Sequence, residues 1–144
     1  MRKNKIRVYV HFVWATWDRL PIIRPEFERE LYRYISTVCR DDKCDVLALN
    51  GMEDHVHLLV SLAPTISMAG LMKDVKGGSS RFVSEELAPG EWFQWQGHYG
   101  AMSVSPHEKS KVIGYIEEQK QRHAAIRLWP EAEETFEVYP DIPE

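Results

Sequence analysis

The hydrophobic positions of the chain fall into two kinds of pattern, and the first kind predicts four β-strands. Residues 5–16 (KIRVYVHFVWAT) are rich in β-branched and aromatic side chains, which is typical of a buried strand. Two shorter apolar runs, 44–50 and 55–62, flank the segment 51–54 (GMED), whose composition suits a hairpin turn. Residues 99–104 form the fourth run. We therefore expect one long strand, a hairpin and a late strand.

In the second kind of pattern, apolar positions recur at helical spacing. Residues 26–40 predict an amphipathic helix that packs on the sheet. Residues 67–87 predict another helix, although four small residues at 77–80 (GGSS) interrupt the pattern and indicate a weak or kinked centre. A capping box at 105–108 (SPHE), with proline at the first helical position, predicts a third helix that runs to about Leu128.

The order of these elements indicates a fold class. Strand, helix, strand, strand, helix, strand and helix make a βαββαβ unit followed by one extra C-terminal helix. This is the α+β arrangement called ferredoxin-like, in which the first and third strands lie in the middle of an antiparallel sheet. We expect one domain over 1–130 and an acidic C-terminal tail over 131–144.

The composition narrows the class of protein. With 144 residues, of which 44% are hydrophobic, the chain has the length and apolar content of one globular domain rather than of a disordered segment. No apolar run is long enough to cross a membrane and the N-terminal residues lack a signal-peptide core, so we expect an intracellular, cytoplasmic protein. Cys39 and Cys44 suit neither a disulfide framework nor a zinc knuckle, and we expect both to be buried.

The distribution of charge leaves a nucleic-acid partner open. A net charge of −4 argues mildly against such a partner, because phosphate binding usually leaves a basic footprint. Six acidic residues and no basic residue follow Pro130, however, so residues 1–130 carry 18 basic against 16 acidic residues. The body of the chain is thus near neutral, and its local basic clusters fit either solvated helix faces or phosphate contacts.

Two histidines on the third predicted strand are the first candidates for chemistry. Residues two apart on a strand project from the same face, so His55 and His57 stand side by side, about 6–7 Å apart along the strand. Two adjacent imidazoles suit one metal ion, but a pair of this kind is more often an ordinary feature of a half-exposed strand. On the last helix, Tyr115 and Gln119 are four residues apart and share a face, which His123 continues less directly. A helix tyrosine is more often a packing residue, so the interest lies in its combination with the histidines.

Taken together, these residues resemble a known family. His55-Val56-His57 on a central strand, followed by a lone tyrosine on a late helix with glutamine one turn on (115–119, YIEEQ), is similar to the single-tyrosine HUH transposases. These are the enzymes of the smallest bacterial insertion sequences, the IS two-hundred-like type, and are related to the REP-associated tyrosine transposases. The resemblance covers roughly 6–127 and includes the stretches 9–16 (YVHFVWAT), 54–61 (DHVHLLVS), 76–81 (KGGSSR) and 95–105 (WQGHYGAMSVS).

The resemblance implies a mechanism. A divalent cation, Mg²⁺ or Mn²⁺, would be held by His55, His57 and Gln119 beside a scissile phosphate of single-stranded DNA. Tyr115 would be the nucleophile, leaving a 5′-phosphotyrosine link and a free 3′-hydroxyl, so that the strand is cut and rejoined without hydrolysis. The implied partners are DNA hairpins at the ends of a mobile element in a bacterial or archaeal nucleoid.

The resemblance also implies a homodimer. Strands would join across the interface, and the tyrosine helix of one subunit would complete the histidine site of the other, with 103–106 as its pivot. Whether Tyr115 acts in its own subunit or in the partner stays open. Two alternatives to a transposase also stay open: a HUH-type nickase that serves replication or repair, and a domesticated DNA-binding module without catalysis.

Several other residues have two interpretations. Lys76 and Arg81 either bind DNA phosphates or flank a helix break on the surface. His11, on the neighbouring central strand, either supports the site or fills the sheet face. Four aromatic side chains could stack on unpaired bases, although packing in a core or loop is their commoner role: Trp92, Phe93, Trp95 and Tyr99.

Overall fold

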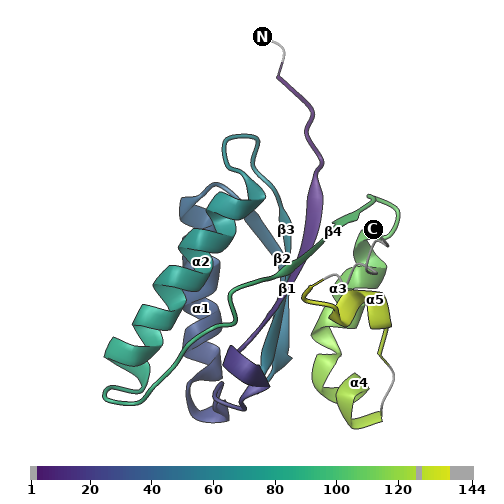
Figure 1. Ribbon diagram of the computed structural model, residues 1–144. Helices are drawn as coiled ribbons and strands as arrows, with labels where there is room; N and C mark the ends of the chain where they lie inside the picture. Colours follow the sequence, from purple (N-terminus) through teal and green to yellow (C-terminus); the bar gives the residue numbers. More distant parts are fainter. Residues whose placement is uncertain (1–2, 126–127, 137–144) are drawn as a thin grey trace, which may run out of the picture.

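The computed structural model of the chain describes residues 3–125 and 128–136 (Figure 1). The strands within these residues are β1 (Tyr9–Ala15), β2 (Asp45–Met52), β3 (His55–Ser61) and β4 (Gly100–Val104). The α-helices are α1 (Pro25–Asp41), α2 (Met68–Phe82), α3 (Lys109–Glu117), α4 (Gln119–Ala125) and α5 (Pro130–Glu133). A 3₁₀ turn, η1 (Trp17–Arg19), follows β1, and a π-helical turn, η2 (Val83–Leu87), follows α2.

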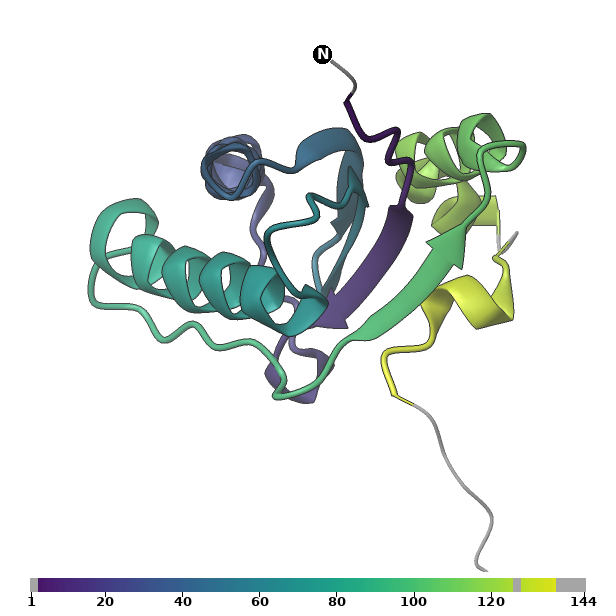
Figure 2. The ribbon, with the colours of Figure 1, turned by 90° about the horizontal axis from the view of Figure 1, so that it is seen from above.

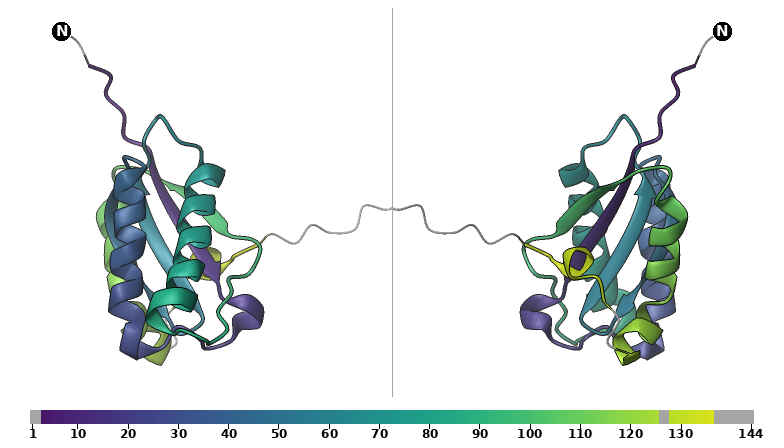
Figure 3. Two further views of the ribbon diagram at one scale, coloured as in Figure 1. Left: turned by 90° about the vertical axis from the view of Figure 1, so that its left-hand side faces the viewer. Right: turned by 90° about the vertical axis from the view of Figure 1, so that its right-hand side faces the viewer.

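The four strands form one antiparallel sheet in the order β2-β3-β1-β4. The first and third strands are therefore the central pair, as the ferredoxin-like prediction requires. Helices cover both faces of this sheet. Figure 2 shows α1 and α2 on one side and α3, α4 and α5 on the other, and the two views of Figure 3 show each layer in front of the strands.

Alternation along the central strands divides the interior into two clusters. Phe12, Trp14 and Leu58 belong to the cluster beneath α1 and α2. Leu59 and Ile116 belong to a second cluster on the opposite face, beneath α3 and α5. Because successive side chains on a strand point to opposite faces, both faces of β3 are buried and neither is left to solvent.

The first strand is shorter than predicted. It begins at Tyr9 rather than at residue 5, and residues 3–8 run beyond the sheet as an exposed segment (Figure 1). The physical reason is the length of its neighbours, because Tyr9 pairs with Ser61 at the end of β3 and with Val104 at the end of β4. The carbonyl oxygen of Val8 still accepts from the N–H of Leu62 at 2.7 Å, but no strand continues beside the residues before it.

The predicted weak centre of the second helix is wrong. α2 continues through the four small residues at 77–80, and the irregular turn η2 comes only after Phe82. A Cβ atom on Gly78 would lie 2.7 Å from the hydroxyl oxygen of Tyr34 on α1. Gly78 therefore allows α1 and α2 to approach each other closely, and it does not break the helix.

The predicted last helix is two helices. The N–H of Glu108 does donate to the Ser105 hydroxyl at 3.3 Å, but α3 begins at Lys109 and ends at Glu117 before α4 starts. The side chain of Asn50, on β2, explains the break between α3 and α4. The Asn50 side-chain amide donates to the carbonyl oxygen of Glu117 at 3.1 Å, so that carbonyl is satisfied outside the helical ladder. The predicted end near Leu128 lies beyond α4, and residues 126–127 are outside the described range.

Both cysteines are buried free thiols, as expected. None of the described helices combines the length and the apolar character needed to cross a bilayer.

Candidate functional site

The site is built on the sheet face that lies beneath α3, α4 and α5. His55 and His57 project to this face from β3, with ring centroids 5.1 Å apart. The register places them opposite Ala15 and Val13 of β1, so both imidazoles lie at the centre of the sheet. Both are almost completely buried, which distinguishes them from histidines on a half-exposed strand.

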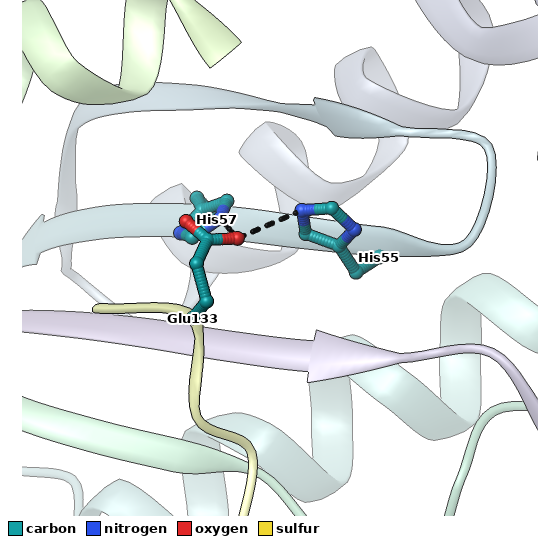
Figure 4. A group of neighbouring side chains, drawn as sticks. All are labelled: His55, His57 and Glu133. Carbon is teal, nitrogen blue, oxygen red and sulfur yellow. Dashed lines mark hydrogen bonds and ion pairs between the residues drawn. The ribbon is translucent and has the colours of Figure 1, made fainter. Parts of the chain in front are cut away.

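Glu133, the last residue of α5, points into the space between the two imidazoles (Figure 4). One of its carboxylate oxygens, Oε1, lies 3.3 Å from Nε2 of His55 and 3.1 Å from Nε2 of His57. The segment after Pro130 therefore reaches across the sheet and supplies an anion to the histidine pair. Figure 3 shows the short helix lying in front of the strands on this side of the molecule.

The other carboxylate oxygen of Glu133 faces the last helices. Its Oε2 accepts a hydrogen bond from the phenolic hydroxyl of Tyr115, and the amide nitrogen of Gln119 lies 3.4 Å from it. The amide oxygen of Gln119 lies 3.3 Å from Nε2 of His55. One carboxylate thus spans the gap between the imidazole pair and the phenol, all within a single chain.

Tyr115 is fully enclosed at this position. Its side chain has 0% exposure, and its ring stacks on Trp129 with centroids 4.1 Å apart. The backbone N–H of Trp129 also donates to the phenolic oxygen at 3.1 Å. Burial, together with the nearby carboxylate of Glu133, raises the pKa of Tyr115 to about 12. The phenol is therefore in its neutral form here.

His55 and the carboxylates beside it stabilise one another in their charged forms. Burial alone would lower the pKa of His55, but its hydrogen bonds with Asp54 and Glu133 outweigh this and raise it to about 9. Burial likewise opposes ionisation of Glu133, but its contacts with His55 and His57 hold the pKa of its carboxyl well below the usual range. An imidazolium at position 55 therefore lies between two carboxylates.

Two further histidines surround the pair. Nε2 of His11, on β1, lies 2.9 Å from Nδ1 of His57, and burial lowers the pKa of His11 to about 3. Nε2 of His123, on α4, lies 3.0 Å from the amide oxygen of Gln119. His11 is thus a buried neutral imidazole that contacts His57 from the neighbouring strand, on the same face of the sheet.

The side chains of His55, His57 and Glu133 place potential metal-ligand atoms close together. Nitrogen atoms of His55 and His57 and a carboxylate oxygen of Glu133 all lie within 4.8 Å of one another. Imidazole nitrogen and carboxylate or amide oxygen together suit Mn²⁺ and similar divalent ions. The cluster is therefore a possible metal site, with Gln119 as a further oxygen donor at its edge.

The structure brings together four of the residues that the sequence singled out: His55, His57, Tyr115 and Gln119. Lys76 and Arg81 are not part of this group, because α2 lies on the opposite face of the sheet. The ammonium of Lys76 instead donates to the backbone carbonyls of Gln96 at 2.6 Å and His98 at 3.1 Å. Arg81 is exposed.

The four aromatic residues of the 92–99 loop have separate roles. Phe93 and Trp95 are buried in the core beneath α1 and α2, and Tyr99 packs against this core, so packing is confirmed for these three. Trp92 is 55% exposed and is the one of the four that can meet a partner.

Sequence reasoning missed Glu133. It lies in a segment whose composition predicts only an acidic tail, and the pattern around it carries no periodicity. A usable signal was the composition of 128–133 (LWPEAE), where apolar residues and a helix-starting proline precede the glutamate.

Comparisons with known proteins agree with one another. The family model of IS200-like transposases matches residues 4–119, a range that contains β1 through Gln119 and ends before α5. The ISDra2 transposase TnpA of Deinococcus radiodurans is 28% identical over 132 residues, which span 85% of this chain and 93% of that protein. The crystal structure of a transposase candidate from Deinococcus radiodurans R1 has a TM-score of 0.64 at 27% identity, covering 83% of this chain and 98% of the other.

A REP-associated tyrosine transposase, solved bound to a REP hairpin, shares the fold. Its TM-score is 0.62 at 14% identity, and the match covers 90% of this chain and 79% of the other. The sheet order, the paired histidines and the helix tyrosine beside them are thus found in a chain whose sequence matches a single family over most of its length. The protein belongs to the IS200-like transposases.

Proposed function

We propose that this transposase cuts and rejoins single-stranded DNA through a covalent link to Tyr115, with a divalent cation held by His55, His57 and Gln119. The observation that carries the proposal is the position of the Glu133 carboxylate. Its two oxygens contact the imidazole pair and the phenol at the same time, so an anion the size of a phosphate can touch both.

The residues that would hold the cation are available in one chain. The Nε2 atoms of His55 and His57 face the same point, and the amide oxygen of Gln119 is within 3.3 Å of the first. Mg²⁺ and Mn²⁺ are the ions that we propose. When bound, such an ion supplies positive charge that stabilises a pentacovalent phosphorane.

The proposed reaction at Tyr115 exchanges one phosphorus–oxygen bond for another and consumes no water. The phenolic oxygen bonds to phosphorus as the bond to the 3′-oxygen breaks, and the departing 3′-oxygen takes up a proton while the phenol loses one. The product is a 5′-phosphotyrosine and a 3′-hydroxyl. Attack by a 3′-hydroxyl on that link reverses the same changes, restores the phenol and joins the strand.

Access to the phenol requires a movement of the chain. Tyr115 has 0% exposure beneath Trp129 and Glu133, so a phosphodiester can reach it only after the segment 128–136 withdraws. Withdrawal removes the Glu133 carboxylate from the imidazoles and leaves Gln119 in place. This is why we propose Gln119, and not Glu133, as the third donor during the reaction.

The proposed partner is a single-stranded DNA hairpin. A protein of the same fold was solved with a REP hairpin bound, and the fold is what the two chains share. On this chain, we propose Arg81 as a phosphate contact, because it is exposed at the surface of α2. We propose a smaller contribution to DNA binding for Lys76, because its ammonium already donates hydrogen bonds to two backbone carbonyls of the 94–98 loop.

We retain the homodimer as a proposal, together with a place at the bacterial or archaeal nucleoid. The phenol and both imidazoles of one chain already meet, which supports a site that a single subunit can build. A dimer in which helices exchange would build the same site from two chains. Light scattering on the purified protein, with and without DNA, measures the oligomeric state.

The function is tested by looking for the covalent intermediate. Purified protein is incubated with Mn²⁺ and hairpin-bearing single-stranded oligonucleotides, and the mixture is separated on a denaturing gel. We expect an adduct with the wild-type protein and none with Tyr115→Phe, which lacks only the nucleophilic oxygen. His57→Ala is expected to lose the adduct because it removes a cation ligand. An undiminished adduct with Tyr115→Phe would contradict the proposal, as would the absence of any adduct with the wild type.

A further inference from the structure

His55 and His57 differ in the group that contacts Nδ1, the ring nitrogen that faces away from the proposed cation. Nδ1 of His55 lies 2.7 Å from a carboxylate oxygen of Asp54. An ionised carboxylate can only accept, so His55 carries a hydrogen on Nδ1. Nδ1 of His57 lies 2.9 Å from Nε2 of His11 instead, and an imidazole can donate or accept.

The direction of the hydrogen bond between His11 and His57 decides what His57 offers to the site. A neutral imidazole has one N–H group. If His11 donates, Nδ1 of His57 accepts, and the hydrogen of His57 stays on Nε2, where Glu133 lies 3.1 Å away. If His11 accepts, the hydrogen of His57 is on Nδ1, and Nε2 presents a lone pair to the site. Only the second arrangement lets Nε2 bind a cation.

His11 is placed to hold this second arrangement. It lies on the central strand β1 with 3% exposure, so water cannot readily replace it beside His57. The two rings have centroids 5.1 Å apart and are tilted by 36°. No carboxylate among the described residues makes a hydrogen bond or ion pair with Nδ1 of His57, so the tautomer of His57 depends on its histidine neighbour.

We propose that His11 is a positioning residue for this transposase: by accepting the Nδ1 hydrogen of His57 at its own Nε2, it turns the lone pair of His57 toward the cation. Asp54 does the same for His55 through a carboxylate. The inference rests on the metal site proposed above and adds to it a residue that touches neither substrate nor cation. Partners of this kind commonly change metal affinity by about 10- to 100-fold when they are removed.

The first test measures Mn²⁺ affinity directly, by electron paramagnetic resonance of free Mn²⁺, without DNA and without turnover. His11→Leu removes the acceptor, and His11→Gln can place an amide oxygen near the position of Nε2. We expect His11→Leu to weaken Mn²⁺ binding by about 10- to 100-fold and His11→Gln to stay within a few-fold of the wild type. Melting temperatures in chelator show whether each variant is folded.

The second test needs no substitution. In the wild-type protein loaded with diamagnetic Mg²⁺, two-bond ¹H–¹⁵N couplings report which ring nitrogen of each histidine carries hydrogen. We expect the hydrogen of His57 on Nδ1 and that of His11 on Nδ1 as well, because Nε2 of His11 accepts. Cation binding at Nε2 of His57 by itself requires the hydrogen of His57 on Nδ1. The hydrogen on Nδ1 of His11 is therefore the part of the pattern that shows His11 accepting at Nε2.

The outcomes separate this inference from the proposed function. If His57→Ala binds Mn²⁺ weakly but His11→Leu binds it like the wild type, His11 does not position His57, and the metal site stands. If the loaded protein carries the His57 hydrogen on Nδ1 but the His11 hydrogen on Nε2, His11 does not accept from His57, and the inference is also overturned. Equal Mn²⁺ binding by the wild type and His57→Ala would overturn the metal site itself, and the role of His11 with it.

Discussion

The ring of Tyr115 lies edge-on to the ring of His57, with centroids 6.0 Å apart. These residues come from α3 and β3, and the contact forms within one chain. The nucleophile that we propose and one of the proposed cation ligands are therefore already neighbours before any DNA is bound. What separates them from a substrate is the segment that carries Trp129 and Glu133.

Removing the Glu133 carboxylate should have opposite effects on stability and on DNA cleavage. We expect Glu133→Ala to destabilise the metal-free protein by about 3 kcal/mol, because His55 loses a buried partner. We also expect it to raise the yield of DNA adduct in Mn²⁺, because no carboxylate then competes with the phosphate. Urea unfolding and denaturing gels measure the two effects. Glu134→Ala, an exposed neighbour, is the control and should change neither. Loss of the adduct in Glu133→Ala would show that the carboxylate works in the reaction itself.

Gln119 should matter most when Glu133 is absent. Our account makes Gln119 the third donor during the reaction, so the double variant Glu133→Ala/Gln119→Ala should lose the adduct that Glu133→Ala retains. Gln121→Ala in the same background is the matched control, because Gln121 is an exposed residue of the same helix. An adduct of full yield in the double variant would remove Gln119 from the site.

The stability of the metal-free protein should peak near pH 6.5. His11, with a pKa lowered to about 3, and His57, with a lowered pKa, stay neutral in the fold while the unfolded chain takes up protons, so stability falls as the pH drops below 6.5. The pKa of His55 is raised to about 9, so its contribution is full below 6.5 and is lost as the pH rises through 9. That loss is on the order of 3 kcal/mol.

Urea unfolding in chelator from pH 4 to 10 measures this profile. Asp54→Asn removes one of the two carboxylates that raise the pKa of His55, so the decline between pH 6.5 and 9 should become shallower. The decline below pH 6.5 should remain, because it comes from other histidines. A wild-type profile that is flat between 6.5 and 9 would mean that His55 is not held as an imidazolium.

Two adjacent glycines of α2 should respond differently to alanine. A Cβ atom on Gly78 would lie 2.7 Å from the Tyr34 hydroxyl, whereas a Cβ on Gly77 meets nothing within 4 Å. We expect Gly78→Ala to destabilise the fold by about 1–3 kcal/mol and Gly77→Ala to stabilise it by about 0.5–1 kcal/mol. Thermal melts measure both. Tyr34→Phe removes the hydroxyl and should recover part of the loss in Gly78→Ala; equal stability of the two alanine variants would contradict this packing.

Local patterns were sufficient for the parts of the site that lie on regular elements. Period-two alternation placed His55 and His57 on one face of a central strand, and the spacing of four placed Tyr115 beside Gln119, even though α3 ends between them. The break itself depends on Asn50, a residue of β2 that the helix sequence does not contain. Its effect could not be predicted from helical periodicity.

The contribution of Glu133 and the pairing of His11 with His57 depend on tertiary structure. α5 has four residues, which is too short for a periodic signal, and nothing near residue 133 in the sequence points to a strand more than 70 residues earlier. The contact between His11 and His57 depends on the register of β1 against β3. Such contacts follow from how elements pack, so composition alone indicated an acidic tail and an unassigned histidine.

The most direct test of the central claim is to identify the residue that carries DNA. The adduct formed in Mn²⁺ is digested with protease and nuclease, and the peptides are analysed by tandem mass spectrometry. Our account predicts a nucleotide joined through its 5′-phosphate to the peptide that contains Tyr115, and a free 3′-hydroxyl on the released strand. A nucleotide attached to any other residue, or cleaved DNA with a free 5′-phosphate and no peptide attached, would contradict it.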